Sequence, residues 1–286
     1  MTTKSEFRCL HRLRVRWAEV DAQKIVFNAN YLLYIDTALA EYWRRLALPY
    51  ESTMEHLGGD MVVRKSTLDY VSSARFDDML DVGVRCVNIG NSSLQFQGAV
   101  FRGDQLLMTA EIVYVYIDAA ARRSHPVPQA LRDVLDAYED GKPMYDVKVG
   151  DWVHLGEGAS RIRTEVFIDE QQIPQDMEWD GADEDCVHAV ASNLFGVPLA
   201  TGRLLEHVPG VAKIGRMAVT SSMRGSGVGR AVLDALTRTA REQGYHEALL
   251  HAQLSAAPFY QRAGFIPRGP EFDEAGIAHV EMVRNL

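Results

Sequence analysis

A glycine-rich stretch in the second half of the sequence has the residue types of an anion-binding site. Arg224-Gly-Ser-Gly-Val-Gly-Arg230 lies between an apolar strand-like run and a helical pattern that contains Val232, Leu233 and Leu236. Glycines let successive backbone N–H groups turn toward one point, and a helix N-terminus adds about half a positive charge. We expect a phosphate or pyrophosphate there, although no Gly-Lys-Ser/Thr ends the stretch as in a Walker A loop. The motif alone leaves a second interpretation open, a strand-to-helix turn without a ligand.

Asp21, Asn28 and Asn30 form a second group of candidate functional residues. Asp21 stands four residues before the apolar triplet Ile25-Val-Phe27, and the asparagines precede a helical pattern. A solvated loop does not need three apolar residues in a row, and a helix does not usually need two amide side chains at its entry. Capping of turns is the alternative role, because Asp and Asn both do this well.

The elements that position Asp21 read as a strand, a long helix and a set of further strands. Residues 13–17 alternate as on a half-buried strand, and the apolar positions of residues 32–46 follow the 3.6-residue period of a helix that ends before Pro49. We expect an antiparallel sheet with one long helix. Both faces of 112–117 are apolar or aromatic, which is consistent with the helix on one face and a second subunit on the other. The further strands are predicted at 61–71, 80–89, 94–101 and 106–117.

The length of 286 residues favours two domains. A short helix is predicted over 129–138, and the polar residues 137–151, which include Gly and Pro, indicate a linker. We therefore place one domain at 1–143 and the other at 144–286. The second half alternates helices and strands, which is typical of a mixed α/β domain. Its predicted elements are helices at 158–170 and 229–243, strands at 186–194, 199–206, 212–219 and 248–253, and a short helix that holds Phe259 and Tyr260.

Composition excludes several classes of function. A net charge of −9 argues against broad binding to nucleic acid or to anionic membranes. Cys9, Cys86 and Cys186 show no C-x-x-C pairing, so neither a disulfide framework nor a zinc site is expected, and no metal is predicted. The amino-terminal segment lacks the apolar core of a signal peptide and no long apolar run follows, which favours a cytoplasmic protein.

Three ordered motifs of the second half resemble the GNAT superfamily of acyl-CoA-dependent N-acetyltransferases. The glycine stretch meets the superfamily pattern Arg/Gln-x-x-Gly-x-Gly/Ala, Gly215–Val219 is similar to its splayed strand, and Pro258–Phe265 matches Phe-Tyr-x-x-x-Gly-Phe. The resemblance implies an α/β fold with a mixed central sheet flanked by helices and a coenzyme A thioester as substrate. It implies that CoA is bound by Met217, Ala218, Val219, Arg224, Gly225, Gly227, Val228, Gly229 and Arg230.

The same resemblance implies that Tyr260 is the general acid that protonates the CoA thiolate as an amine attacks the thioester. A phenol is a weak acid with a pKa of about 10, but a thiolate whose conjugate acid has a pKa of about 8.5 needs only a hydrogen bond or a late proton. The alternative is that Tyr260 packs beside Phe259. Residues 165–174 and 178–180 resemble one bacterial branch of the superfamily. Glu170, Glu178 and His251 are candidate bases or amine-binding groups, although an ordinary structural or surface role is favoured for each.

The first half resembles the hotdog-fold acyl-CoA thioesterases of the 4-hydroxybenzoyl-CoA thioesterase type. The resemblance covers roughly residues 8–140 and rests on Asp21-Ala-Gln-Lys-Ile-Val-Phe-Asn-Ala-Asn-Tyr31 followed by the long helix. It implies that a thioester carbonyl is polarised by N–H groups at the start of the Asn30 helix, where the helix dipole is positive. Asp21 would then attack the carbonyl or activate water, and Asn28, Asn30 and Tyr31 would bind substrate.

Two residues depart from the thioesterase pattern. Many bacterial relatives hold a histidine at the position of Asn28 and a glycine at that of Lys24. Asparagine forms hydrogen bonds but does not exchange a proton near pH 7. Glu41 reads as a solvated or ion-paired helix residue, and Arg122 and Arg123 either meet CoA phosphates or are solvated.

Together the two resemblances predict a bifunctional acyl-CoA enzyme: thioester hydrolysis in the first domain, and transfer of an acyl group, expected to be acetyl, to an unidentified amine in the second. The alternative is an acetyltransferase whose hotdog half is a non-catalytic module for acyl-CoA binding or dimerisation. In either case we expect a homo-oligomer that assembles through the first domain.

Overall fold

The structure is a computed structural model that describes residues 2–286. It contains two compact units, the first ending at Met144 and the second running Tyr145–Leu286. Within the described residues, no helix is both long and apolar enough to cross a membrane.

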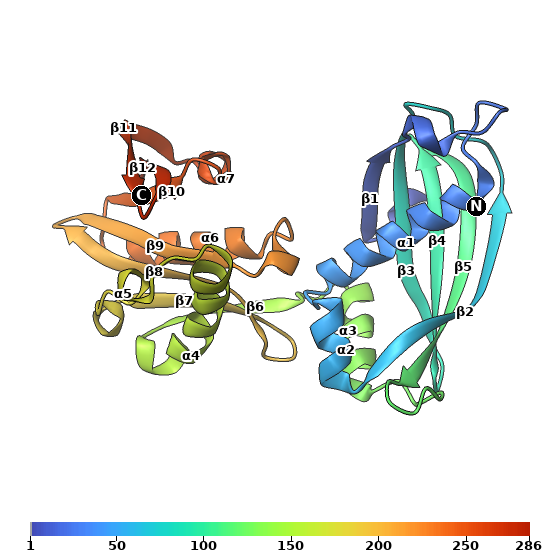
Figure 1. Ribbon diagram of the computed structural model, residues 1–286, viewed down its shortest axis with the longest axis horizontal. Coiled ribbons are helices and arrows are strands. Elements are labelled where there is room, and N and C mark those ends of the chain that lie inside the picture. The colour runs from blue at the N-terminus through green and yellow to red at the C-terminus, as the bar shows by residue number, and fades with distance from the viewer. Residues whose placement is uncertain (1) are drawn as a thin grey trace. The chain divides into compact units, whose positions relative to one another are not determined.

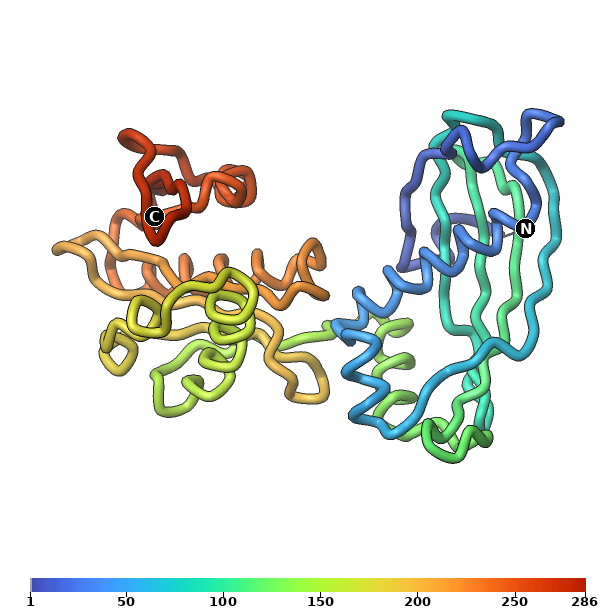
Figure 2. The backbone as a smooth tube through the Cα atoms, viewed as in Figure 1, coloured from blue at the N-terminus to red at the C-terminus, as the bar shows by residue number. Residues whose placement is uncertain are grey.

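The first unit is a five-stranded antiparallel sheet with a long helix across one face (Figure 1). The strand order is β1-β3-β4-β5-β2, so that β1 and β2 form the two edges. The Cα trace in Figure 2 shows the helix α1 running obliquely over the strands. The elements are β1 (Cys9–Arg14), α1 (Asn28–Arg45), α2 (Tyr50–Leu57), β2 (Gly59–Tyr70), β3 (Met79–Ile89), β4 (Ser93–Arg102), β5 (Gln105–Asp118) and α3 (Gln129–Glu139).

Helix α1 forms because its apolar side chains recur at helical spacing on one face. Tyr31, Ile35, Ala38 and Tyr42 are all buried, so the helix is stabilised by its contact with the sheet. Ile35 reaches the sheet at Gly98, where a Cβ would lie 2.6 Å from its Cδ1. The helix thus lies close to β4.

The sequence prediction of the first strand was wrong at its end. Strand β1 ends at Arg14, and Trp17 begins the short 3-10 helix η2 (Trp17–Glu19) with 74% of its surface exposed. The buried residue of this turn is Glu19, whose carboxylate is hydrogen-bonded by Arg16. The hydrogen bonds between Arg16 and Glu19 therefore determine a turn here, although the apolar alternation of residues 13–17 predicted a strand.

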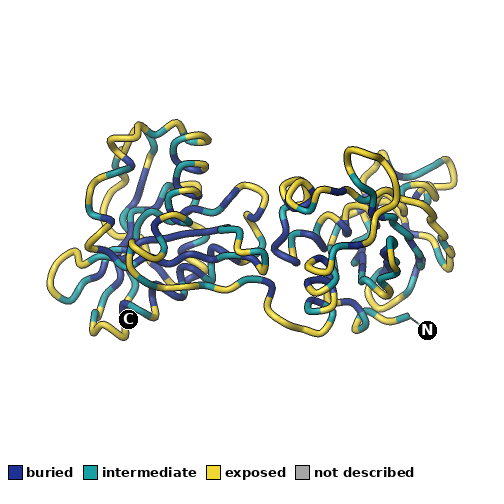
Figure 3. Tube along the Cα trace, turned by 90° about the horizontal axis from the view of Figure 1, so that it is seen from below, coloured by how far each residue is buried: buried dark blue, intermediate teal, exposed yellow. Residues whose placement is uncertain are grey.

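The second unit is a seven-stranded mixed sheet in the order β11-β12-β10-β9-β8-β7-β6. Only β9 and β10 are parallel neighbours. The central strands are mainly buried and the loops exposed (Figure 3). The elements are β6 (Tyr145–Gly150), α4 (Trp152–Arg163), the π-helical segment η3 (Thr164–Glu170), α5 (Gln175–Glu178), η4 (Asp183–Asp185), β7 (Val187–Asn193), β8 (Pro198–Val208), β9 (Val211–Val219), η5 (Ser221–Met223), α6 (Val228–Glu242), β10 (Glu247–Gln253), α7 (Ala257–Arg262), β11 (Ile266–Glu274) and β12 (Ile277–Asn285).

Helices α4 and α6 cover opposite faces of this sheet. A Cβ at Gly202 would meet Val232 and Leu236 of α6, whereas the adjacent Arg203 reaches the Asp183 carboxylate that also binds Arg163 of α4. Successive strand residues point to opposite faces. The two helices therefore flank the sheet.

The predicted linker and the end of the chain also differ from expectation. Residues 145–150 form β6, an edge strand paired with β7, because their alternating pattern is half-buried there. The two final strands, β11 and β12, were not predicted. The helix expected at 158–170 begins earlier, at Trp152, and continues as η3 after Arg163.

Candidate active sites

Asp21 lies in a tight loop whose ends are held together by a bridge between Val20 and Val26. Its backbone N–H donates to the carbonyl of Ile25 at 2.9 Å, and its Oδ1 accepts the N–H of Gln23 at 2.8 Å. The carboxylate therefore closes a turn, as the capping interpretation expects, and it is also half-exposed to solvent. Closing the turn is compatible with the catalytic role that the sequence predicts for Asp21.

Lys24 adopts a left-handed backbone conformation in this loop. Its φ is 62°, which favours glycine because a Cβ crowds the following carbonyl. The glycine of the thioesterase pattern at this position thus has a physical reason. Lys24 keeps the turn at a cost in backbone strain.

The three predicted substrate-binding residues have different surroundings at the start of α1. Asn28 is exposed, and its Oδ1 accepts the N–H of Ala29. Asn30 donates from Nδ2 to the carbonyl of Glu19 at 2.8 Å. Tyr31 is buried, and its hydroxyl accepts the N–H of Ala74 at 2.8 Å. Asn30 and Tyr31 thus join the helix to its loops, while Asn28 faces solvent.

Glu19 is a buried carboxylate that sequence reasoning missed. Its side chain accepts hydrogen bonds from the Tyr34 hydroxyl at 2.8 Å and from the Arg16 backbone N–H at 2.7 Å. Burial opposes ionisation, but the hydrogen bonds from Arg16 and Tyr34 outweigh it and lower the pKa of Glu19. Its carbonyl also accepts the N–H of Phe27. Glu19 therefore holds the entry of α1 against the Asp21 loop.

The other charged residues considered in this unit lie at the surface or in ion pairs. Glu41 is paired with Arg44, one helical turn further on. Arg122 and Arg123 are exposed at the end of the β5 hairpin. No contact of these arginines with Asp21 is observed in the described part of the chain.

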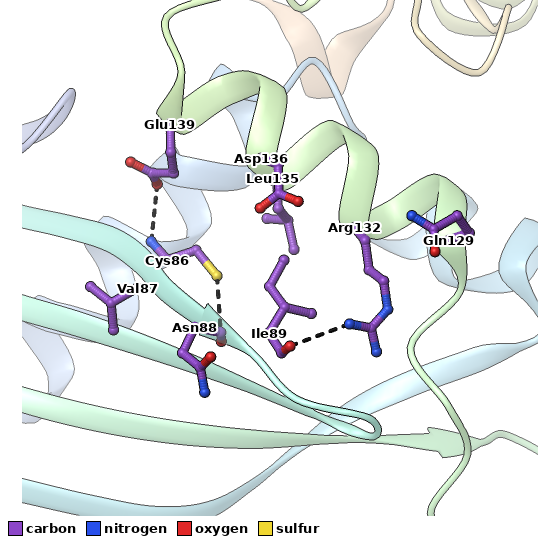
Figure 4. A pocket seen from close by; sticks show the side chains of 9 residues that line it. All are labelled: Cys86, Val87, Asn88, Ile89, Gln129, Arg132, Leu135, Asp136 and Glu139. Atoms are coloured by element: carbon purple, nitrogen blue, oxygen red, sulfur yellow. Dashed lines mark hydrogen bonds between the residues drawn. The ribbon is translucent and has the colours of Figure 1, made fainter.

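A polar cavity of about 490 Å³ lies between β3 and α3 (Figure 4). Strand β1 pairs with β3 only as far as Val84, so the edge beyond is open. Glu139 accepts the N–H of Cys86 at 3.0 Å and the Tyr42 hydroxyl at 2.6 Å. Arg132 binds the carbonyl of Ile89 at 3.3 Å. These side chains thus form hydrogen bonds with backbone groups at the free edge of β3.

The cysteines do not have the environment of nucleophiles. Burial raises the pKa of Cys9 and of Cys86 to about 12, and it also raises that of Cys186. The reactive thiolate is disfavoured at neutral pH. No group of His, Cys, Asp and Glu side chains arranged to hold a metal ion occurs within residues 2–286.

In the second unit, β9 and β10 are paired for only part of their length. The parallel register joins Val211–Lys213 to Glu247–Leu249 and then stops. A bulge in the β8–β9 pairing includes Arg216, whose φ is 51°. Nothing lies within 4 Å of a Cβ placed at Gly215. The two strands thus form a fork that leaves the main chain of Met217–Val219 without a β10 partner.

The glycine-rich loop connects this fork to α6. Gly225 and Gly227 have φ values of 83° and 94°, so both need the conformational freedom of glycine. Gly229 has a different reason, because a Cβ there would lie 2.8 Å from Cγ2 of Val219. The first N–H groups of α6, which begins at Val228, have no acceptor within the helix and point out of its end. The loop has the geometry of an anion cradle.

Both arginines of the loop bind carboxylates. Arg224 forms a bidentate ion pair with Glu170, at 2.7 Å from Nη1 to Oε1 and 2.5 Å from Nη2 to Oε2. Arg230 donates from Nε to Asp234 at 2.9 Å and from Nη1 to the carbonyl of Arg262. A carboxylate holds each guanidinium where the sequence predicted a phosphate.

Tyr260 is buried in α7. Its ring makes edge contacts with Phe259 and Phe265, at centroid distances of 4.9 and 6.2 Å. Its hydroxyl has no hydrogen-bond partner among residues 2–286. Burial raises the pKa of Tyr260 to about 12. The phenol therefore remains protonated near pH 7, as an acid must.

His251 lies just beyond the last paired residues of the fork. Its Nδ1 is 3.4 Å from Oε2 of Glu274 and 3.5 Å from Nζ of Lys213, and its Nε2 is 4.0 Å from Oε2 of Glu281. Burial, assisted by Lys213, lowers the pKa of His251. A neutral imidazole there can accept a proton. The charged neighbours Lys213, Glu274 and Glu281 were not evident from the sequence.

Glu178 is part of a buried network of ion pairs. Its carboxylate binds Arg163 and Arg216, while Asp183 binds Arg163 and Arg203. Burial raises the pKa of Glu178 against the opposing effect of Arg163. Because two arginines occupy its oxygens, Glu178 has the contacts of a structural residue.

The two units define two classes of fold, and comparison with known proteins agrees with both. Residues 15–135 match the thioesterase-like superfamily, and residues 156–286 match the acetyltransferase (GNAT) domain. The first unit is a hotdog domain, and the second is a GNAT domain. The chain therefore belongs to the GNAT acetyltransferases through its second unit and carries a thioesterase-like domain before it.

Individual relatives match one unit each. A Bacillus subtilis protein described as an acetyltransferase is 37% identical over 129 residues, which cover 44% of this chain and 86% of the relative. The acyl-CoA thioester hydrolase YbgC of Escherichia coli is 27% identical over 120 residues, 42% of this chain and 89% of the relative. A thioesterase structure from Thermus thermophilus, complexed with coenzyme A and Zn, is 27% identical with a TM-score of 0.42, and the match covers 49% of this chain and 98% of that one.

Proposed function

We propose that the protein is a bifunctional acyl-CoA enzyme, which transfers an acyl group to an amine in its GNAT unit and hydrolyses thioesters in its hotdog unit. The observation that carries the acyl-transfer part of this proposal is the β9–β10 fork joined to the glycine loop. A pantetheine chain fits the unpaired edge of Met217–Val219, and a pyrophosphate fits the N–H groups of Gly225–Arg230. The buried hydroxyl of Thr220, at the start of the loop, has no partner among residues 2–286 and is a further donor for this ligand.

The transfer step follows from the positions of the main-chain groups and Tyr260. The amine nitrogen attacks the thioester carbonyl carbon in the fork, and the C–S bond breaks. Tyr260 hydrogen-bonds the departing sulfur or gives it a proton. We assign the proton that the amine loses to His251, which lies just beyond the last paired residues of the fork and whose lowered pKa keeps it neutral near pH 7. The products are an amide and the CoA thiol.

In the hotdog unit, Asp21 activates water or attacks the carbonyl, and the N–H groups at the start of α1 stabilise the oxyanion. The match to an acyl-CoA thioester hydrolase supports this assignment. Asn28 faces solvent at the same helix end and can hydrogen-bond substrate but cannot exchange a proton near pH 7. The products are a carboxylate and the CoA thiol.

Asn28 also supports the second candidate function, in which the hotdog unit binds acyl-CoA or dimerises without catalysis. Thiol release by the intact protein without an amine separates the two. We expect release that depends on Asp21. Release that is equal in wild type and in Asp21→Asn would show that the hotdog unit does not hydrolyse thioesters through Asp21 and would favour the non-catalytic module.

We further propose that the protein assembles through the hotdog unit. Strand β2 is an edge strand of 12 residues and exposes Val62 and Val63. Long exposed edge strands readily pair with another chain. Light scattering on the intact protein is expected to give a dimer or larger species, and a monomeric mass would contradict this assembly.

A further inference from the structure

The ion pair between Glu170 and Arg224 joins two segments that are 54 residues apart in sequence. Glu170 ends the π-helical segment η3, and Arg224 begins the glycine-rich loop. Besides its two bonds to the carboxylate, Arg224 donates from Nε to the carbonyl of Val219 at 3.2 Å. Every nitrogen of the guanidinium is thus engaged.

The geometry of this pair is the geometry of phosphate recognition. Two parallel N–H donors of an arginine bind a carboxylate and a phosphate in the same way. The side chains of Glu170 and Arg224 are 42% and 45% exposed, so solvent screens the pair, although its bidentate geometry makes it stronger than most exposed pairs. A diphosphate in the loop could therefore replace the carboxylate.

We propose that Glu170 is a positioning residue that competes with the CoA diphosphate for Arg224. In the free protein the Glu170 carboxylate holds the Arg224 guanidinium beside the loop. When CoA binds, its diphosphate takes the place of this carboxylate. This inference rests on the proposed acyl-CoA function. The exchange weakens CoA binding, which favours release of the CoA product.

The exchange also connects the CoA loop to the other arm of the fork. Gln171, next to Glu170, accepts a hydrogen bond from Nε2 of Gln253 on β10 at 3.0 Å. When Glu170 is displaced, η3 loses its contact with Arg224 but keeps the hydrogen bond from Gln253 of β10 to Gln171. The segment that responds to CoA is therefore also in contact with β10.

Glu170→Gln in the intact protein tests the competition. We expect calorimetric titration with CoA to give a dissociation constant about two- to fivefold lower than wild type, the range for an exposed ion pair. The matched control is Glu165→Gln, which removes the same charge from an exposed residue of the same segment that lies near Arg224 without pairing with it. Its effect is expected to be smaller. An unchanged or weaker affinity of Glu170→Gln, or an equal gain in Glu165→Gln, would overturn the proposal.

A double variant separates competition from a general effect of charge. In an Arg224→Gln background, Glu170→Gln is expected to give no further gain in CoA affinity, because the contested guanidinium is absent. A gain of the same size in that background would contradict the mechanism. If the wild-type protein binds no CoA, the proposed function fails together with this inference. If it binds CoA and Glu170→Gln gives no gain, only the inference fails.

Discussion

Gly229 at the start of α6 lies so close to Val219 of β9 that a single added methyl group would overlap it, at 2.8 Å from Cγ2. This contact holds the N-terminus of α6 beside the end of the fork. The anion cradle and the unpaired main chain of β9 are therefore parts of one packed arrangement. The glycine has a steric reason that is independent of any ligand.

Gly229→Ala is expected to destabilise the second unit and to weaken CoA binding. Overpacking of this kind costs about 1 to 3 kcal/mol. Chemical denaturation measures the loss of unfolding free energy. Titration with CoA measures the loss of affinity that displacement of the α6 N-terminus causes. Gly150→Ala is the control, because its Cβ would meet Leu155 at an ordinary 3.6 Å. Equal stability of the two variants would show that α6 is not held by this contact.

Lys24→Gly is expected to stabilise the first unit. Relief of the left-handed conformation gains about 1 to 2 kcal/mol, and the greater freedom of glycine in the unfolded chain takes back about 0.5 to 1 kcal/mol. Gln23→Gly, at a neighbouring position without positive φ, should instead lose stability. Urea denaturation of both variants checks the opposite signs. A loss in Lys24→Gly would mean that the lysine side chain stabilises the loop by more than its backbone costs.

Much of the fold could be predicted from the sequence, because the spacing of apolar residues along one element shows which of its faces is buried. The period of α1 and the strands β3 to β5 follow directly from apolar residues that face the core, whereas β2 is mostly exposed. Trp17 was mispredicted because the hydrogen bonds of Glu19, and not apolar burial, decide that turn. Strand β11 was missed because it is mostly exposed and its polar residues pair across the sheet, as Arg268 does with Glu281. Strand β12 was missed although Val280, Met282 and Val283 are buried.

The candidate sites were predictable to a smaller extent. The glycine positions in the α6 loop followed from the motif, but only Gly225 and Gly227 have a local reason, their positive φ, whereas Gly229 is required by its contact with Val219. The partners of Arg224, His251 and Glu178 were not predictable, because each comes from another element brought near by the fold. The sequence therefore indicated which residue types were available, while the structure determined which of them are already paired.

Glu178→Ala is expected to lose stability, as a buried ion-pair member does. Removal of one partner of a buried pair costs about 3 to 5 kcal/mol, and the Arg163 guanidinium would lose the carboxylate at its Nε. Glu178→Gln keeps an acceptor and should lose less, with Glu157→Ala as an exposed control. Thermal unfolding measures the series. A Glu178→Gln protein that is fully stable but inactive in transfer would instead indicate a base.

Tyr260→Phe is expected to slow acyl transfer while CoA affinity stays close to wild type. Burial raises the pKa of Tyr260 to about 12, so the acid form persists below that pH and is lost only as the pH rises through it. Transfer should therefore show no loss from Tyr260 between about pH 8 and about pH 10. Initial rates with acetyl-CoA across this range check the profile. A decline within it that is absent in Tyr260→Phe would contradict the raised pKa, and transfer that Tyr260→Phe leaves unchanged would exclude the phenol as the acid.

Thiol release by the intact protein tests the bifunctional account most directly. Wild type, Asp21→Asn and Tyr260→Phe are compared over short, long and aromatic acyl-CoAs, with and without a panel of amines. Asp21→Asn keeps an oxygen that can accept the N–H of Gln23 and so separates chemistry from loop folding. We expect Asp21→Asn to abolish the thiol release that occurs without an amine. We expect Tyr260→Phe to reduce only the additional thiol release that occurs when an amine is present. Release that neither variant changes would contradict the bifunctional account.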